Sequence, residues 1–284
     1  MIKNKKIGFI GQGWIGKNYA DNFEERGFSV TRYSLDRCYV NNKDKIRECD
    51  IVFIAVPTPT TPAGFDFSAI QQSLFCVGKN KTVVIKSTIL PGTTEILQES
   101  HPDLFIMHSP EFLSEATVSH DVANPVFNII GLPSMEKEFY LRAQEVLDIL
   151  PKANIEKICL AKEAEFFKYI RNSFFFSKVV FMNILYDLAF SLGCDWSKIE
   201  ELLEADPWIG PMHIKPVHKS GRGAGGHCFI KDFAAFVDFY KKKVGDKEGQ
   251  FLLDANVRKN ISLLIATNKD LDILRSVYGQ DFIK

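Results

Sequence analysis

A glycine-rich turn near the start of the chain restricts its possible folds more than any other feature. An apolar run at 6–10 leads directly into the turn, and a helical pattern at 15–26 follows it. Glycines at this spacing let a strand turn tightly into a helix and let the backbone approach a pyrophosphate at the helix N-terminus. We therefore predict a dinucleotide-binding turn, formed by Gly11, Gly13, Trp14, Ile15 and Gly16.

Short apolar runs alternate with helical patterns over the first 130 residues. The runs that we interpret as buried strands are 6–10, 28–33, 49–56, 81–88, 104–109 and 127–131. Helical patterns include 67–78 and a closing helix at 134–150, and a short return strand is expected at 151–160. This alternation predicts an α/β domain with a doubly wound, mostly parallel sheet. We assign residues 1–160 to this Rossmann-type domain.

The second part of the chain, 161–284, has a helical character. No glycine or proline interrupts the sequence from Ala161 to Leu192, which predicts a helix about 50 Å long. Further helices are expected at 195–205, 228–243 and 249–275, with a loop at 206–226. The long helix is more apolar than one small domain can cover, so we expect a homodimer that forms through it.

Charge and cysteine content exclude several classes of protein. Lys+Arg and Asp+Glu both number 35, which provides no electrostatic basis for nucleic acid or an anionic membrane as the main partner. The six cysteines form no CxxC pair, so free thiols in a reducing compartment are expected rather than disulfides or a metal site. No signal peptide is recognisable, and polar residues interrupt the apolar run at 174–190. We predict a cytoplasmic protein.

The end of the second predicted strand bears on the choice of cofactor. An acidic residue at this point usually holds the ribose of NAD. Here Ser34 occupies the position, Asp36 follows two residues later, and Arg32 and Arg37 flank them. Serine with arginine can accept the 2′-phosphate of NADP, whereas Asp36 can serve NAD. We favour NAD and leave NADP open.

Three loops follow predicted strands at the carboxyl edge of the sheet, where ligands bind in open α/β folds. The loop at 54–68 contains Pro57 and Thr58, and the loop at 85–94 contains Ser87 and Thr88. The third loop, 108–121, contains two carboxylates, Glu111 and Glu115. At helical spacing these two would share a face. A solvated acidic surface is the alternative.

The helical part contains two further candidate groups. Lys168 and Asn172 lie four residues apart among phenylalanines, so the lysine either meets an anion or extends to solvent. Cys228 follows a glycine-rich loop. A buried thiol is the commonest fate of a cysteine, but glycines allow a ligand to approach, and a helix that starts here would lower the thiol pKa. Asp232 would lie one turn further on.

From residue 6 to about 260 the chain resembles the UDP-glucose and GDP-mannose dehydrogenases. The resemblance rests on motifs in the family's order, and the combination of the proline–glutamate and cysteine motifs is highly specific. The motifs are GxGxxG (11–16), AVPTP (55–59), KST (86–88), SPEFLSEA (109–116), AEFFKYIRN (164–172), GAGGHCFIKD (223–232) and NVRK (256–259).

The resemblance implies two successive NAD-dependent oxidations of the primary alcohol of a nucleotide sugar. It implies that Cys228 forms a thiohemiacetal and then a thioester, and that Lys168 and Asn172 hold the oxyanion. Asp232 and Thr88 would handle the alcohol proton through a water. Glu111 would be the base for hydrolysis, and Glu115 would lie near the cofactor. The implied substrate-binding residues are Glu111, Phe112, Leu113, Lys168, Asn172 and Gly225.

The chain also departs from the family pattern. The third, nucleotide-gripping domain is expected to be absent, and Trp208 stands where the family has an arginine. Basic side chains of the same loop either replace lost phosphate contacts or form a solvated surface; they are His213, Lys215, His218 and Lys219. Two alternatives remain: a β-hydroxyacid dehydrogenase, which oxidises once without a cysteine, and a non-catalytic dinucleotide-binding protein.

Overall fold

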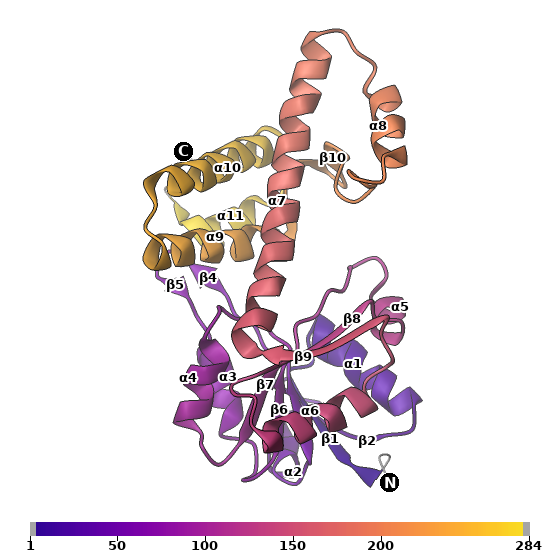
Figure 1. Ribbon diagram of the computed structural model, residues 1–284, viewed down its shortest axis with the longest axis vertical. Helices are drawn as coiled ribbons and strands as arrows, with labels where there is room; N and C mark the ends of the chain where they lie inside the picture. Colours follow the sequence, from indigo (N-terminus) through magenta and orange to yellow (C-terminus); the bar gives the residue numbers. More distant parts are fainter. Residues whose placement is uncertain (1–3, 281–284) are drawn as a thin grey trace. The chain divides into compact units, whose positions relative to one another are not determined.

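The computed structural model describes residues 4–280, which divide into two compact units (Figure 1). The first, the α/β unit, comprises the residues up to Thr58 together with Asp66–Lys168. The second, the helical unit, comprises Pro59–Phe65 and the residues from Tyr169 onward. A long helix, α7 (Ala161–Ser191), contributes residues to both units.

The α/β unit contains one seven-stranded sheet with the order β2-β1-β3-β6-β7-β8-β9. All neighbouring strands run parallel except β7 and β8, which pair antiparallel at His108 and Gly131. The predicted α/β fold with a mostly parallel sheet is therefore confirmed. The strands are β1 (Lys6–Ile10), β2 (Ser29–Tyr33), β3 (Ile51–Ile54), β6 (Thr82–Ile85), β7 (Phe105–His108), β8 (Phe127–Leu132) and β9 (Ile155–Leu160).

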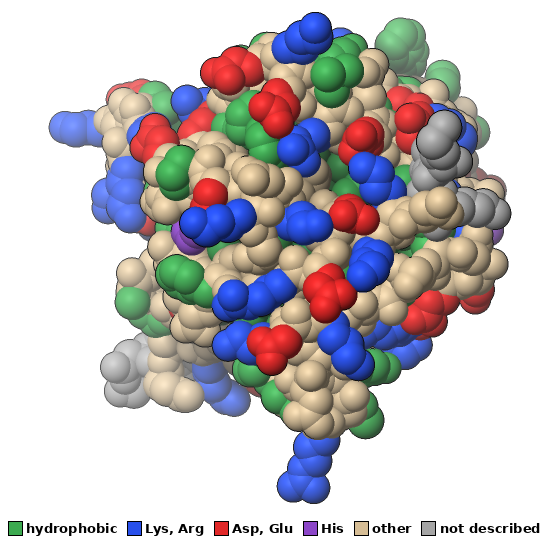
Figure 2. Space-filling model, turned by 90° about the horizontal axis from the view of Figure 1, so that it is seen from below, with side chains coloured by type: hydrophobic (Ala, Val, Ile, Leu, Met, Phe, Trp, Pro, Cys, Tyr) green, Lys and Arg blue, Asp and Glu red, His purple; other side chains and the backbone are tan. Residues whose placement is uncertain are grey.

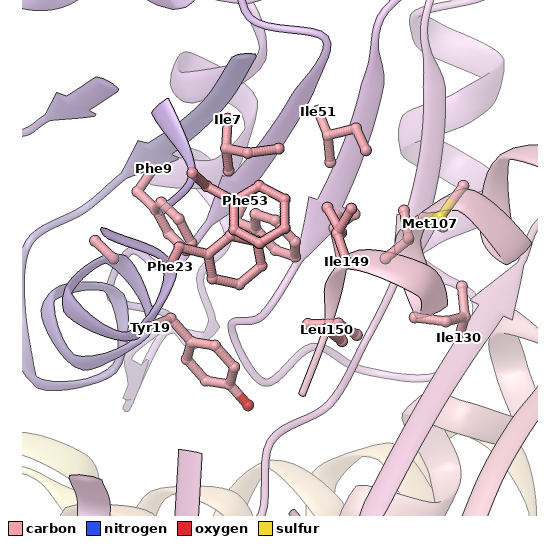
Figure 3. Packing of buried hydrophobic residues seen from close by; sticks show 14 of the residues in the cluster. Ile7, Phe9, Tyr19, Phe23, Ile51, Phe53, Met107, Ile130, Ile149 and Leu150 are labelled. Carbon is pink, nitrogen blue, oxygen red and sulfur yellow. The ribbon is translucent and has the colours of Figure 1, made fainter. Parts of the chain in front are cut away.

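Helices of the α/β unit pack on the sheet through phenylalanine and aliphatic side chains (Figure 3). Phe9 stacks on Phe53 with ring centroids 4.9 Å apart, and Phe23 of α1 meets both rings at 5.4 Å. Central strands such as β3 are buried at every position, which is why they appear as continuous apolar runs. The helices are α1 (Trp14–Glu25), η2 (Val40–Asn42), α2 (Lys43–Ile46), α3 (Ser68–Leu74), α4 (Thr93–Ser100), α5 (Val118–Ala123) and α6 (Lys137–Ile149).

The helical unit is built on α7, as the sequence predicts. Phe176 of α7 stacks on Phe233 with ring centroids 3.8 Å apart, and apolar residues of α10 and α11 complete this core. A small hairpin that follows β3 belongs to this unit and contacts α9. The elements are β4 (Thr60–Thr61), β5 (Gly64–Phe65), α8 (Trp196–Ala205), β10 (Val217–His218), β11 (Gly221–Arg222), α9 (Gly226–Lys243), α10 (Lys247–Ala266) and α11 (Leu271–Tyr278).

The single helix expected at 249–275 is wrong, because the structure has two helices there. A turn separates α10 from α11, and Asn268 and Asp270 both adopt left-handed backbone angles with φ of 53°. Asparagine and aspartate tolerate this region better than other residues with a side chain. The stiff loop expected at 54–68 likewise contains the β4–β5 hairpin, and α3 ends at Leu74 rather than near residue 78.

Helix α7 is long and apolar enough to cross a membrane by length and composition, which also holds for core helices of soluble proteins. Its apolar stretch contains Asp187, which pairs with Arg222 and Lys259. An ionised pair would be costly inside a bilayer, which supports the prediction that α7 is not a membrane span. Figure 2 shows acidic and basic side chains interspersed over one face of the molecule, in keeping with the balanced total charge.

Candidate functional site

The glycine turn has the geometry that a dinucleotide pyrophosphate requires. Gly11 has a φ of 89°, and a side chain there would collide with the Ala55 carbonyl at the end of β3. A side chain at Gly16 would collide with the Gly11 carbonyl. Gly13, at the N-cap of α1, is exposed and has open space beside its Cα. The turn is thus packed tightly on the protein side and open at the helix N-terminus, which fits NAD.

The charges at the end of β2 favour NAD over NADP. Arg32 lies 2.7 Å from Asp21 and 2.7 Å from Glu24, so two carboxylates already match its charge. The hydroxyl of Ser34 donates to the Asp36 carboxylate at 2.8 Å, and Asp36 is exposed. An exposed carboxylate next to a neutralised arginine suits a ribose hydroxyl better than a phosphate.

The loops that follow β3 and β6 are bound to each other. The Ser87 hydroxyl donates to the Val56 carbonyl at 2.7 Å and accepts from the Val56 amide at 3.0 Å. The Thr58 hydroxyl donates to the Thr88 carbonyl at 2.8 Å. The Thr58 side chain is buried, and its hydroxyl is engaged in this hydrogen bond. Pro57 is exposed and Thr88 is half-buried. These contacts hold two of the predicted loops in a common arrangement at the carboxyl edge of the sheet.

Lys168 and Glu111 lie together in the α/β unit. The Lys168 amino group donates to the Glu111 carbonyl at 2.6 Å and lies 3.6 Å from the Glu111 carboxylate. Both residues are buried, with exposures of 4% and 5%. The lysine therefore meets an anion and does not extend to solvent. The Phe112 ring is 5.5 Å from its nitrogen, and the Leu113 amide donates to the Glu111 carboxylate at 2.9 Å.

The helical face expected for Glu111 and Glu115 is wrong. The chain after β7 is irregular from Ser109 to Ser114, and α5 begins only at Val118. Glu111 accepts the amide of a residue two positions later, which is a local turn rather than a helical contact. Glu115 is exposed while Glu111 is buried.

A second buried lysine beside this pair is unexpected from the sequence. Lys86, directly after β6, donates to the Ser109 hydroxyl at 3.0 Å and lies 4.5 Å from the Tyr19 ring centre. Burial lowers its pKa to about 8, while Glu111 opposes and Lys168 reinforces this shift. Burial also lowers the pKa of the neighbouring His108 to about 3. The sequence signal that could have identified Lys86 is its place directly after the apolar run 82–85, at the end of a buried strand.

In the helical unit, Asn172 and Asp232 are hydrogen-bonded. The Asn172 amide donates to the Asp232 carboxylate at 2.7 Å, and both side chains are buried. The other Asp232 oxygen accepts from the amino group of the adjacent Lys231. Lys168 and Asn172 lie one turn apart on α7, as their spacing predicts.

Cys228 is exposed in the first turn of α9, so the alternative of a buried thiol is wrong. The backbone before it is unusual, because Gly223 and Gly226 have φ angles of 87° and 80°. Gly225 is the N-cap of α9. The thiol is accessible at a helix start, which is the surrounding expected for a reactive cysteine.

The loop before the glycines contains the basic residues for which the sequence allowed two roles, phosphate contact or a solvated surface. Lys215 pairs with Glu200 at 3.1 Å and Glu204 at 3.7 Å, so carboxylates already match its charge. His213 lies between the rings of Phe175 and Phe229, and burial lowers its pKa to about 4. Lys215 is paired and His213 is neutral at pH 7, so neither offers a ready phosphate contact. Trp208 is 95% exposed.

Comparison with known proteins identifies related sequences. Two sequence profiles of the UDP-glucose/GDP-mannose dehydrogenase family match the chain, the NAD binding domain over residues 35–148 and the central domain over residues 162–260. UDP-glucose 6-dehydrogenase TuaD of Bacillus subtilis is 25% identical over 97% of this chain and 67% of that protein. The chain spans 30% to 67% of the length of the curated relatives it matches.

Two solved structures share the fold. A UDP-glucose dehydrogenase from Pyrobaculum islandicum is 24% identical, with a TM-score of 0.78 over 92% of this chain and 71% of that chain. A 3-hydroxyisobutyrate dehydrogenase from Mycobacterium tuberculosis is 16% identical, with a TM-score of 0.71 over 96% of this chain and 98% of that chain. At these identities the two structures establish the fold alone.

Proposed function

Because this chain belongs to the UDP-glucose/GDP-mannose dehydrogenase family, we propose that it is an NAD-dependent oxidoreductase that oxidises the primary alcohol of a nucleotide sugar. The observation that carries the proposal is the exposed thiol of Cys228, which lies at the start of α9 within the region that matches the family's central domain. A single-step dehydrogenase needs no such thiol.

The first step converts the alcohol to an aldehyde. NAD supplies the chemistry of hydride acceptance in each oxidation. Asp232 and Thr88 are the residues to which we assign removal of the hydroxyl proton. Asp232 suits this role because it is buried and acceptor-only when ionised, with Asn172 and Lys231 orienting it.

The second step passes through covalent bonds to Cys228. The thiolate adds to the aldehyde carbon to give a thiohemiacetal, and loss of a second hydride and a proton leaves a thioester. Glu111 removes a proton from water, the water oxygen bonds to the carbonyl carbon, and the carbon–sulfur bond breaks to release the carboxylate and the thiol. Lys168 and Asn172 stabilise the oxyanions, because the ammonium and the amide are donors on successive turns of α7.

We assign two further groups of residues to binding. The cofactor group is Gly11, Gly13, Trp14, Ile15, Gly16, Ser34, Pro57, Thr58, Thr88 and Glu115. The substrate group is Glu111, Phe112, Leu113, Lys168, Asn172 and Gly225. Support comes from the open side of the glycine turn and from the contact between Lys168 and Glu111.

The test is the number of NADH molecules formed for each substrate molecule. A panel of UDP- and GDP-sugars and free sugars is incubated with NAD or NADP, and absorbance of the reduced cofactor is followed. We expect two NADH per substrate for the wild type and at most one for Cys228→Ser. Cys194→Ser, which changes another exposed cysteine, is the matched control and keeps two.

The outcomes separate the alternative functions. One NADH per substrate with an unaffected Cys228→Ala variant would establish a single-step dehydrogenase. Binding of NAD without turnover of any sugar, together with a Cys228 inert to iodoacetamide at neutral pH, would establish a non-catalytic binding protein.

The active species is proposed to be a homodimer that forms through α7. Apolar side chains remain exposed along one stripe of this helix at intervals of three, four or seven residues, which place them on one face. A second copy would cover them. The stripe comprises Phe166, Ile170, Phe174, Phe181, Ile184 and Leu188. Phe181→Glu is expected to give a monomer in analytical ultracentrifugation, whereas Phe75→Glu, at an exposed phenylalanine of the α/β unit, leaves the dimer intact. An unchanged mass for Phe181→Glu would contradict this interface.

A further inference from the structure

The glycine-rich segment before Cys228 is bound by the turn between α10 and α11, here called the α10–α11 turn (267–270). The Lys269 amino group donates to the carbonyls of Gly221 at 3.3 Å and Gly223 at 3.0 Å. The Asp270 carboxylate accepts the amide of Gly226, the first residue of α9, at 2.7 Å. The backbone of Gly221, Gly223 and Gly226 is therefore hydrogen-bonded to side chains that lie about 45 residues later in the chain.

Asn260 of α10 holds the middle of the same segment. Its side-chain oxygen accepts the Ala224 amide at 2.7 Å, and its side-chain nitrogen donates to the Ala224 carbonyl at 3.0 Å. Both polar atoms of one backbone residue are thus satisfied by one side chain. Asn260 and Ala224 are buried, at 2% and 1% exposure, so water cannot easily replace these bonds.

The glycines are spaced to allow this contact. A Cβ at Gly223 would lie 2.9 Å from the Asn260 oxygen, and a Cβ at Gly225 would lie 2.7 Å from the Lys269 side chain. Gly221 meets Thr267 in the same way. Gly226, in contrast, has open space around its Cα. Packing within the protein therefore accounts for the glycines at 221, 223 and 225.

The backbone of Asp270 is adapted to its role. Its φ of 53° lies in the left-handed region, and the chain turns there so that the carboxylate reaches the first amide of α9. A carboxylate at this point satisfies one of the amides that a helix leaves open at its start. Cys228 lies two residues further on. The orientation of its helical turn therefore depends on the Asp270 contact.

We propose that Asn260, Lys269 and Asp270 are positioning residues that hold the segment 221–226 and thereby direct the Cys228 thiol for its covalent step. The family's central-domain profile ends at residue 260, so two of the three lie beyond the matched region. The catalytic part of this inference rests on the proposed function of Cys228. The attachment of the segment 221–226 rests only on its hydrogen bonds and is independent of the proposed function.

The test uses Asp270→Gly, because glycine keeps the left-handed backbone and removes only the carboxylate. Asp270→Asn retains both an acceptor and tolerance of this backbone, and it serves as the rescue variant. Asp272→Asn, at an exposed position of α11, is the matched control for loss of charge. Hydrogen exchange of the amides 222–228, the rate of Cys228 alkylation by iodoacetamide, and the two oxidation rates are measured on the whole chain.

We expect exchange at 222–228 to rise about tenfold or more in Asp270→Gly. We expect the second oxidation to slow about tenfold or more, with a changed alkylation rate, while the first oxidation changes little. Asp270→Asn recovers most of the wild-type amide exchange and of the second oxidation rate. Asp272→Asn matches the wild type in both measurements. Unchanged exchange in Asp270→Gly overturns the attachment. Raised exchange with unchanged alkylation and second oxidation overturns the positioning role.

Cys228→Ser, measured in parallel, distinguishes failure of the proposed function from failure of this inference. If Cys228→Ser leaves the second oxidation intact, the covalent mechanism is wrong, whereas the exchange data still decide the attachment. Should Asp270→Gly not fold, Lys269→Met provides a second way to release the segment. Lys269→Met with wild-type exchange at 222–228 would overturn the attachment.

Discussion

The Lys168–Glu111 pair of the α/β unit and Cys228 of the helical unit are held in opposite ways. In the α/β unit, Lys168 and Glu111 are themselves buried, and their charges and hydrogen bonds determine their positions. In the helical unit, Cys228 is exposed, and the backbone that precedes it is held instead. A charged group can be located by its partners, whereas a thiol makes only weak hydrogen bonds and depends on the placement of its main chain.

This difference determines what a substitution does. Loss of one buried charge leaves its partner uncompensated and lowers the free energy of unfolding. Loss of a backbone attachment near Cys228 changes local geometry with a smaller effect on global stability. The following substitutions test the contrast in order of expected size.

Lys168→Met has the largest expected effect. It leaves the Glu111 carboxylate buried without its nearest cation, and we expect the free energy of unfolding to fall by about 3–5 kcal/mol. Urea denaturation measures the change. Lys162→Met is the control on the same helix, because Lys162 is exposed and its pair with Glu95 is expected to contribute less than about 1 kcal/mol. Equal losses in the two variants would contradict the distinction.

Gly225→Ala is expected to have an intermediate effect. The added Cβ has to displace the Lys269 side chain and the Asp270 carboxylate, which should lower the free energy of unfolding by about 1–3 kcal/mol. Gly13→Ala is the matched substitution in the other glycine motif, where a Cβ meets no atom within 4 Å. Thermal unfolding without cofactor should show a change within about 0.5 kcal/mol there. A tolerated Gly225→Ala would argue against close packing of the α10–α11 turn.

A buried carboxyl of the α/β unit predicts a modest pH effect. Burial raises the pKa of Glu165 from 4.5 to about 7, although hydrogen bonds from Thr94 and Gly92 oppose the shift. The native state keeps this proton where the unfolded chain has released it, so the free energy of unfolding falls as pH rises from about 4.5 to about 7.

The measurement is urea denaturation at pH 5 and pH 8. Between these pH values the free energy of unfolding of the wild type should fall by about 1–3 kcal/mol more than that of Glu165→Gln. Identical pH dependence in the two proteins would show that Glu165 titrates at its ordinary value in the native state.

Local patterns predicted much of the molecule. The strand runs, the glycine turn of residues 11–16 and the helix from Ala161 follow from hydrophobic periodicity and from glycine and proline placement, which act over a few residues. The placement of Lys168 and Asn172 one turn apart was predictable because no glycine or proline interrupts the helix around them. The same spacing misled for Glu111 and Glu115, since the chain there is irregular after Pro110.

The contacts that orient these groups depend on distant parts of the chain. The sequence by itself determined the α/β and helical character of the two parts, the dinucleotide turn and the residue types available for chemistry, because those depend on neighbours along the chain. Only the tertiary structure decided that Lys86 lies buried beside Ser109 and Tyr19, and that Asp270 and Asn260 hold the segment before Cys228. Such pairings follow from packing between elements, which no local pattern specifies.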